Sequence, residues 1–110
     1  MVKVDQAFLQ GLEKPIILCL LSRGPRHGYG LIKELMSLTG RRLKPSIVYP
    51  FLHWLEKEGF AVGKWAQINE RKVKYYSLTE KGEKLLNRVR EFFKRPIKEI
   101  MMDLLIGERK

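Results

Sequence analysis

The chain has 110 residues, which suffices for one domain with a single core but is too short to enclose a deep catalytic cleft between two domains. Its 22 Lys and Arg against 12 Asp and Glu give a formal net charge of +10, and this charge favours a polyanionic partner such as DNA, RNA or an anionic lipid surface. The excess is largest in residues 41–75, which carry 8 basic and 3 acidic residues. In residues 76–110 acidic residues are interleaved, and a merely solvated surface is a serious alternative there.

The first predicted element is a buried helix of about two turns that begins at Pro15 and ends near the turn at residues 22–25. The single cysteine, Cys19, lies in its apolar run and cannot form an internal disulfide, which indicates a small core residue in a reducing compartment. The run is shorter than the ~20 residues that a membrane-spanning helix needs. Asp5 interrupts the N-terminus, which lacks a signal-peptide layout. We therefore expect a cytoplasmic protein without a membrane partner.

Two further helices follow in the pattern of apolar residues. The second is predicted by apolar residues at helical spacing that end at Gly40, namely Leu31, Ile32, Leu35, Met36 and Leu38. The third covers residues 45–58 and has an inward stripe formed by Val48, Phe51, Leu52 and Leu55. Pro45 suits its first turn, whereas Pro50 should remove a backbone hydrogen bond and kink the helix.

A hairpin and a long helix complete the predicted order. Residues 60–68 and 72–78 are rich in β-prone side chains and are separated by Asn69, Glu70 and Arg71, which predicts a β-hairpin. Thr79 is a plausible N-cap for the last helix. The apolar residues of that helix recur every three or four positions, at Val89, Phe93, Ile97, Ile100 and Leu104, and Pro96 should bend it.

Three motifs carry a family resemblance. They are His27-Gly28-Tyr29, then Pro-Ser-Ile-Val-Tyr-Pro at residues 45–50, then Lys-Tyr-Tyr-Ser-Leu-Thr-Glu-Lys-Gly at residues 74–82. In this order, on a small basic chain, they resemble the DNA-binding domain of the PadR-type transcriptional regulators over roughly residues 15–86. The resemblance implies a mainly α fold with a small β-hairpin, a winged helix-turn-helix with a long C-terminal dimerisation helix. We expect residues 1–86 to form the DNA-binding domain and residues 87–110 the dimerisation helix.

The third helix is the expected base-reading element, because in this plan the second helix of the helix-turn-helix pair enters the major groove. With the apolar stripe inward, Ser46, His53 and Lys57 fall on the opposite side, flanked by Tyr49 and Trp54. Hydroxyl and imidazole groups suit base edges, and ammonium groups suit phosphates. For Trp54 packing in the core or an interface is an equal alternative, and for His53 the alternative is an exposed polar residue without contact.

The predicted hairpin carries cations with aromatic residues between them. Strand alternation sends Lys72 and Lys74 to one face and Val73 and Tyr75 to the other, giving a cationic face with an apolar underside. Relative to the family, Glu70 stands where a glycine is usual. The complete set of expected DNA-binding residues is Lys44, Ser46, Tyr49, His53, Lys57, Lys64, Arg71, Lys72 and Lys74.

Departures from the family pattern concern the starts of the second and third helices. The resemblance implies that Gly28 permits a close approach and that Tyr29 packs against the helical core, without a DNA contact for either. Gly30 replaces a residue that is usually polar. Lys44 replaces the usual Ser or Thr cap and Ile47 replaces a small hydroxyl residue, so Lys44 offers a positive charge where relatives offer a hydroxyl.

The C-terminal helix is the expected dimer contact. The resemblance implies a homodimer, and one small domain could not fully bury the apolar stripe alone. The expected interface residues are Val89, Phe92, Phe93, Ile97, Ile100, Met101 and Leu104. The alternative is that this helix folds back onto its own core.

The function indicated is a homodimeric, sequence-specific, double-stranded DNA-binding transcriptional regulator that acts as a repressor. The alternatives are a non-specific architectural DNA-binding protein and a winged-helix protein-interaction module of a transcription assembly. Neither a phosphate-binding glycine loop nor a Ser, His and Asp arrangement can be placed, and two histidines with one cysteine do not make a metal site. We therefore expect no catalytic residue, no metal and no cofactor. The resemblance suggests that some relatives bind phenolic or drug-like compounds, and the identity of any small-molecule effector of this chain stays open.

Overall fold

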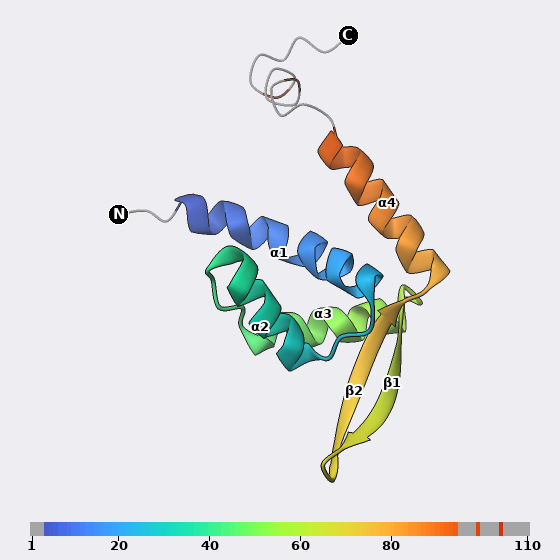
Figure 1. The fold of residues 1–110 in the computed structure, drawn as a ribbon. Helices are drawn as coiled ribbons and strands as arrows, with labels where there is room; N and C mark the ends of the chain where they lie inside the picture. The colour runs from blue at the N-terminus through green and yellow to red at the C-terminus, as the bar shows by residue number, and fades with distance from the viewer. Residues whose placement is uncertain (1–3, 95–98, 100–103, 105–110) are drawn as a thin grey trace.

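The computed structural model describes residues 4–94, 99 and 104, and the elements follow the predicted order. They are α1 (Val4–Arg23), α2 (Gly28–Thr39), α3 (Pro45–Lys57), β1 (Ala61–Ile68), β2 (Arg71–Leu78) and α4 (Glu80–Lys94). In Figure 1, α1, α2 and α3 gather into one body, from which the hairpin and α4 extend in different directions. No helix within these described residues is both long and apolar enough to cross a membrane.

Helix α1 begins at Val4, so the predicted start at Pro15 is wrong. Pro15 lies inside the helix, where a proline removes one backbone N–H from the hydrogen-bond ladder. The turn before it is held by a tertiary contact, because the buried Glu13 places its carboxylate 3.5 Å from the guanidinium of Arg41, which follows α2. The local preference of proline for a first turn could not anticipate this anchor.

The core lies between the three N-terminal helices and the bases of β2 and α4. Its fully buried large side chains include Ile17, Leu21, Leu31, Leu35, Leu52, Leu55 and Leu86. The predicted inward stripe of α3 is confirmed, since Val48, Phe51, Leu52 and Leu55 are all buried. The helix continues through Pro50 because this stripe fixes the turns on both sides of it.

The turn between α2 and α3 is defined by one glycine and one buried leucine. Gly40 has a φ of 74°, the left-handed conformation that glycine favours, and its N–H donates to the Met36 carbonyl at 2.9 Å. The predicted end of the second helix is thus confirmed. Leu43 is 1% exposed and secures the turn to the core before Pro45 starts α3.

The hairpin is antiparallel and pairs from Ala61 with Leu78 to Ile68 with Arg71. Its turn has two residues, Asn69 and Glu70, with φ values of 50° and 66°. Positive φ at both central residues is the requirement of a type I′ turn, which matches the twist of the strands. The predicted three-residue turn is wrong by one position, because Arg71 belongs to β2.

The start of α4 is bonded to the connection between α3 and β1. Thr79 is the N-cap that the sequence predicted, since its hydroxyl oxygen accepts from the Gly82 N–H at 3.1 Å. The same hydroxyl donates to the Gly59 carbonyl at 2.6 Å, and Lys81 donates to the Glu58 carbonyl at 2.7 Å. A Cβ at Gly82 would overlap the carbonyl of Phe60. These contacts, which we call the α4 junction, join the start of α4 to the connection that follows α3.

Candidate nucleic-acid interface

The solvent-facing side of α3 carries the polar residues that the sequence placed there. Ser46, His53 and Lys57 are exposed, and Tyr49 is 39% exposed. Trp54 is different, because its ring stacks on Phe51 at a centroid distance of 6.0 Å and meets the tilted ring of Phe60 at 5.5 Å. Trp54 is also 46% exposed, so it combines packing of its ring with exposure at the surface. The polar side of α3 is left free for a ligand.

The first turn of α2 is capped by a histidine. The Nδ1 atom of His27 accepts from the Gly30 N–H at 3.1 Å, which satisfies one of the unpaired donors of the first turn. A Cβ at Gly30 would lie 3.2 Å from the His27 ring, so the small residue at this position leaves room for the cap. The sequence prediction missed this role of His27, although a polar residue directly before an apolar helical pattern is the signal for it.

Gly28 is buried, whereas its neighbour Tyr29 is exposed. The expected close approach at Gly28 is confirmed, because a Cβ there would overlap the ring of Tyr49 on α3. Tyr29 does not pack against the core as predicted, since it is 57% exposed and its ring lies 5.6 Å from the Lys33 ammonium. In α2 the inward positions are occupied by Leu31, Ile32 and Leu35, and Tyr29 falls outside their stripe.

A cleft of about 830 Å³ lies between the start of α2, the polar side of α3 and the hairpin. Its lining includes five predicted DNA-binding residues, namely Tyr49, His53, Arg71, Lys72 and Lys74. It also includes His27 and Tyr29, which were not in the predicted set. The other predicted residues, Lys44, Ser46, Lys57 and Lys64, are exposed but do not line this cleft. An edge-to-face contact between His27 and Tyr75, with ring centroids 5.1 Å apart, connects α2 to the hairpin.

Both faces of β2 contact the domain, because Lys74 and Tyr76 on one face turn towards α3 and Tyr75 on the other meets His27, so the predicted division into a cationic outer face and an apolar underside is wrong. Tyr76, which shares the face of Lys74 by alternation, is 3% exposed. Lys74 donates to the Glu56 carboxylate of α3 at 2.8 Å, and this hydrogen bond raises the pKa of Lys74 above its usual value. Burial likewise raises the pKa of the Tyr76 hydroxyl. Alternation correctly groups the lysines, but it cannot tell that both faces contact the domain.

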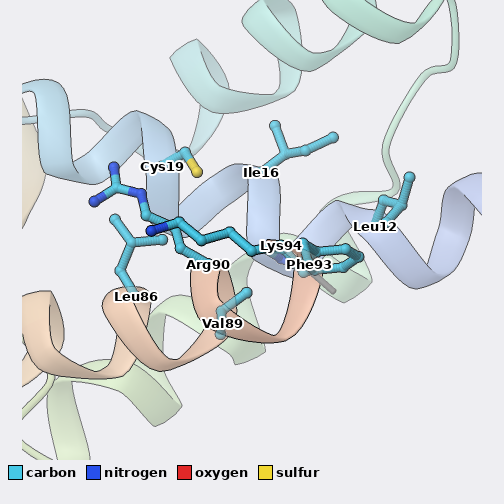
Figure 2. A pocket seen from close by; sticks show the side chains of 9 residues that line it. Leu12, Ile16, Cys19, Leu86, Val89, Arg90, Phe93 and Lys94 are labelled. Carbon is cyan, nitrogen blue, oxygen red and sulfur yellow. The ribbon is translucent and has the colours of Figure 1, made fainter. Parts of the chain in front are cut away.

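A second surface lies between α1 and α4, where a groove of about 400 Å³ is lined almost entirely by apolar atoms. Figure 2 shows the side chains that line it, including Leu12, Ile16 and Cys19 from α1 and Val89 and Phe93 from α4. Cys19 is half-buried and packs against the core from this side. The groove gives the molecule an apolar surface remote from the cleft described above.

The predicted dimer residues divide into three groups. Val89 is half-buried against the core of its own chain, as the alternative of a folded-back helix requires. Phe92 and Phe93 are 57% and 48% exposed and meet edge to face, and Leu104 is 73% exposed. Ile97, Ile100 and Met101, like Pro96, lie outside the described residues.

Comparison with known proteins identifies the family. Residues 17–88 match the family model described as the transcriptional regulator PadR-like family. The chain belongs to the PadR-like family of transcriptional regulators. The match spans α2, α3 and the hairpin, and it includes the three motifs on which the resemblance was based.

Two curated relatives, both transcriptional regulators, have the same identity to this chain but different lengths. The transcriptional regulator YqjI of Escherichia coli K12 is 33% identical over 86 residues, which cover 76% of this chain and 40% of that protein. The transcriptional regulator Rv3488 of Mycobacterium tuberculosis is 33% identical over 82 residues, covering 74% of this chain and 72% of that protein. The chain therefore spans two fifths of the length of the first relative and most of the second.

The chain also has the same fold as a solved PadR structure. Bacillus subtilis PadR in complex with operator DNA is 32% identical with a TM-score of 0.62, over 68% of this chain and 43% of that one. The predicted fold class is thereby confirmed as a mainly helical winged helix with a two-stranded hairpin.

Proposed function

We propose that this chain binds double-stranded DNA with α3 in the major groove and the hairpin on the neighbouring phosphate backbone. The observation that carries the proposal is the cleft in which the polar side of α3 and the cations of the hairpin converge, with Tyr49 and His53 on one wall and Arg71 and Lys72 on the other. The solved complex of a family member with operator DNA supports the same partner.

The exposed groups divide by the chemistry they offer. Ser46 and His53 present a hydroxyl and an imidazole, which suit hydrogen bonds to base edges. Lys44 and Lys57, near the two ends of α3, offer charges to phosphates on either side of the groove. On the hairpin the exposed cations are Lys64, Arg71 and Lys72. Tyr49 offers its hydroxyl, and its ring lies against Gly28, where a larger side chain would overlap it.

We further propose that the protein acts as a homodimer that represses transcription in the cytoplasm by occupying a promoter. The exposed pair Phe92 and Phe93, together with the apolar groove beside α1, supports self-association through residues 87–110, with residues 1–86 as the DNA-binding part. A dimer presents two copies of α3, and such an arrangement recognises operators with two half-sites about 34–36 Å apart.

The test is selection of bound sequences from a random duplex library, followed by titration at several salt concentrations. A palindromic consensus whose affinity falls by about 0.9 log unit per log unit of salt for each neutralised phosphate supports specific binding by a dimer. Steep salt dependence without a consensus would instead indicate a non-specific architectural protein. A flat salt response would overturn DNA binding and favour a protein-interaction module.

A further inference from the structure

Lys74 is held at its ammonium and along its stem by its own domain. Its Nζ atom lies 2.8 Å from Glu56 Oε1, 5.3 Å from the centroid of the Tyr76 ring and 5.6 Å from that of the Trp65 ring. The lysine side chain is 24% exposed and that of Glu56 is 34% exposed. A carboxylate and two aromatic faces together satisfy the charge, whereas Lys72 on the same face of β2 is exposed.

The absence of a side chain at Gly63 leaves room for the side chain of Lys74. A Cβ at this position of β1 would overlap Lys74 Cε and would lie 3.1 Å from Glu56 Oε2. Gly63 pairs with Tyr76 and Trp65 pairs with Lys74, so the lysine crosses β1 beside the residue that lacks a side chain. Glycine weakens a strand interior, and close approach of another group is a recognised reason for finding it there.

Glu56, which accepts the hydrogen bond from Lys74, belongs to α3. It lies three residues after His53 and seven after Tyr49, so the three share one side of the helix. The ion pair therefore joins the hairpin to the same side of the helix that we propose for base reading. A partly exposed ion pair of this kind adds little to the stability of the whole fold by itself, and its main effect is to restrict the position of the hairpin relative to α3.

We propose that Lys74 is a positioning residue that fixes the hairpin to α3 through Glu56, and that it does not serve as a phosphate contact. We call Glu56, Gly63 and Lys74 the wing lock. The inference deepens the proposed DNA binding and rests on it, because the lock sets the distance between the base-reading helix and the phosphate-binding hairpin. It replaces the role that the sequence pattern alone suggested for Lys74.

The two roles of Lys74 predict opposite effects of one conservative substitution. Glu56→Asp keeps the charge but shortens the side chain, so the lock is broken while the net charge is unchanged. If Lys74 positions the hairpin, operator affinity should fall by roughly fivefold. If Lys74 neutralises a phosphate, the substitution releases it and affinity stays the same or rises. Glu58→Asp, at the exposed C-cap position directly after the same helix, is the matched control and should have no effect.

The salt dependence of binding supplies the second readout. Lys74→Met should weaken operator binding to the same extent as Glu56→Asp and leave the slope of log K against log salt unchanged. Lys72→Met, on the same strand face, should make that slope shallower by about 0.9. The double variant of Glu56 and Lys74 should be no weaker than either single variant, because both remove one contact. A slope change of about 0.9 for Lys74→Met would overturn the wing lock.

Hydrogen exchange without DNA separates the wing lock from the proposed function. Both single variants should accelerate exchange of β1 and β2 amides to the same extent, with α1 and α2 unaffected. Unchanged hairpin protection in both variants would overturn the wing lock whatever the protein binds. If the unaltered protein binds no duplex while both single variants accelerate exchange of the hairpin amides, the result contradicts the proposed DNA binding and supports the wing lock.

Discussion

Ser46 and His53 on α3 and Arg71 on β2 should contribute different kinds of binding energy. His53→Ala and Ser46→Ala should each relax preference at particular base pairs by about 1–3 kcal/mol, because a lost base contact affects only the sequence that it recognised. Arg71→Ala should weaken operator and scrambled duplexes by similar factors and reduce the salt slope by about one unit.

Titration of these three variants on both duplexes provides the measurement. Their exposure in the structure makes loss of fold an unsuitable explanation for any change, and thermal unfolding of each variant serves as the control. The division of roles fails if Arg71→Ala alters sequence preference while the α3 variants weaken both duplexes equally.

Gly82 at the α4 junction permits a second prediction for a single residue. Gly82→Ala should lower the free energy of unfolding by about 1–3 kcal/mol, since the added Cβ meets the backbone carbonyl of Phe60 and backbone cannot move aside as a side chain can. Gly11→Ala is the matched control, because nothing lies within 4 Å of that Cβ and the substitution lies within a helix. Chemical denaturation should show Gly11→Ala stabilising the protein by about 0.5–1 kcal/mol. Equal effects of the two substitutions would contradict the contact at Gly82.

The turn of the hairpin holds two residues other than glycine, Asn69 and Glu70, at positive φ. Glu70 adopts a φ of 66° without being glycine, and a left-handed conformation costs an ordinary residue about 1–2 kcal/mol. Glu70→Gly should therefore raise the protection of hairpin amides against exchange, by about fivefold for a gain of about 1 kcal/mol. Glu70→Gln removes the charge but retains the strain, so it should leave protection unchanged. A gain of the same size with glutamine would assign the effect to charge.

Local sequence pattern was enough to predict some features of the helices but not others. The stripe of α3 and the caps at Gly40 and Thr79 were predictable because helical periodicity and terminal chemistry are local properties. The start of α1 was not, because the local preference of Pro15 for a first turn gives no sign of residues 4–14, whose Glu13 contacts Arg41 across the domain. Exposure of Tyr29 has the same cause, since the position of α3 decides which side of α2 is covered.

The candidate site was predicted more completely in composition than in geometry. The polar side of α3 and the hairpin cations were identified from spacing, and the cleft brings five of the nine together. The partnership of Lys74 with Glu56 could not be foreseen, because the two residues are 18 positions apart and meet only when the hairpin folds over α3. His27 was recognisable as a cap, but its place in the cleft follows from the tertiary fold.

For the whole molecule, the testable property is self-association through α4. Phe93→Glu should weaken the proposed dimer by tenfold or more, on the order of a hot-spot loss above 1.4 kcal/mol, because it places a charge in an apolar contact. The monomer should stay folded, since Phe93 is 48% exposed in the single chain. Sedimentation equilibrium at low micromolar concentration measures the effect. Asn87→Glu adds the same charge to an exposed position of α4 and is the control, so equal dissociation by both would point to net charge as the cause.

The α4 junction couples the orientation of α4 to that of α3, so that α4 can act as a lever. Thr79, Lys81 and Gly82 contact Glu58, Gly59 and Phe60, which follow α3 directly, so a tilt of α4 transmitted through these contacts would also turn α3, the helix that we propose for base reading. The 15 residues of α4 span about 22 Å, so a tilt of about 10° corresponds to a displacement of about 4 Å between its ends. In a dimer assembled through α4, the angle of this lever would be the dimension that matches the protein to the spacing of its operator half-sites.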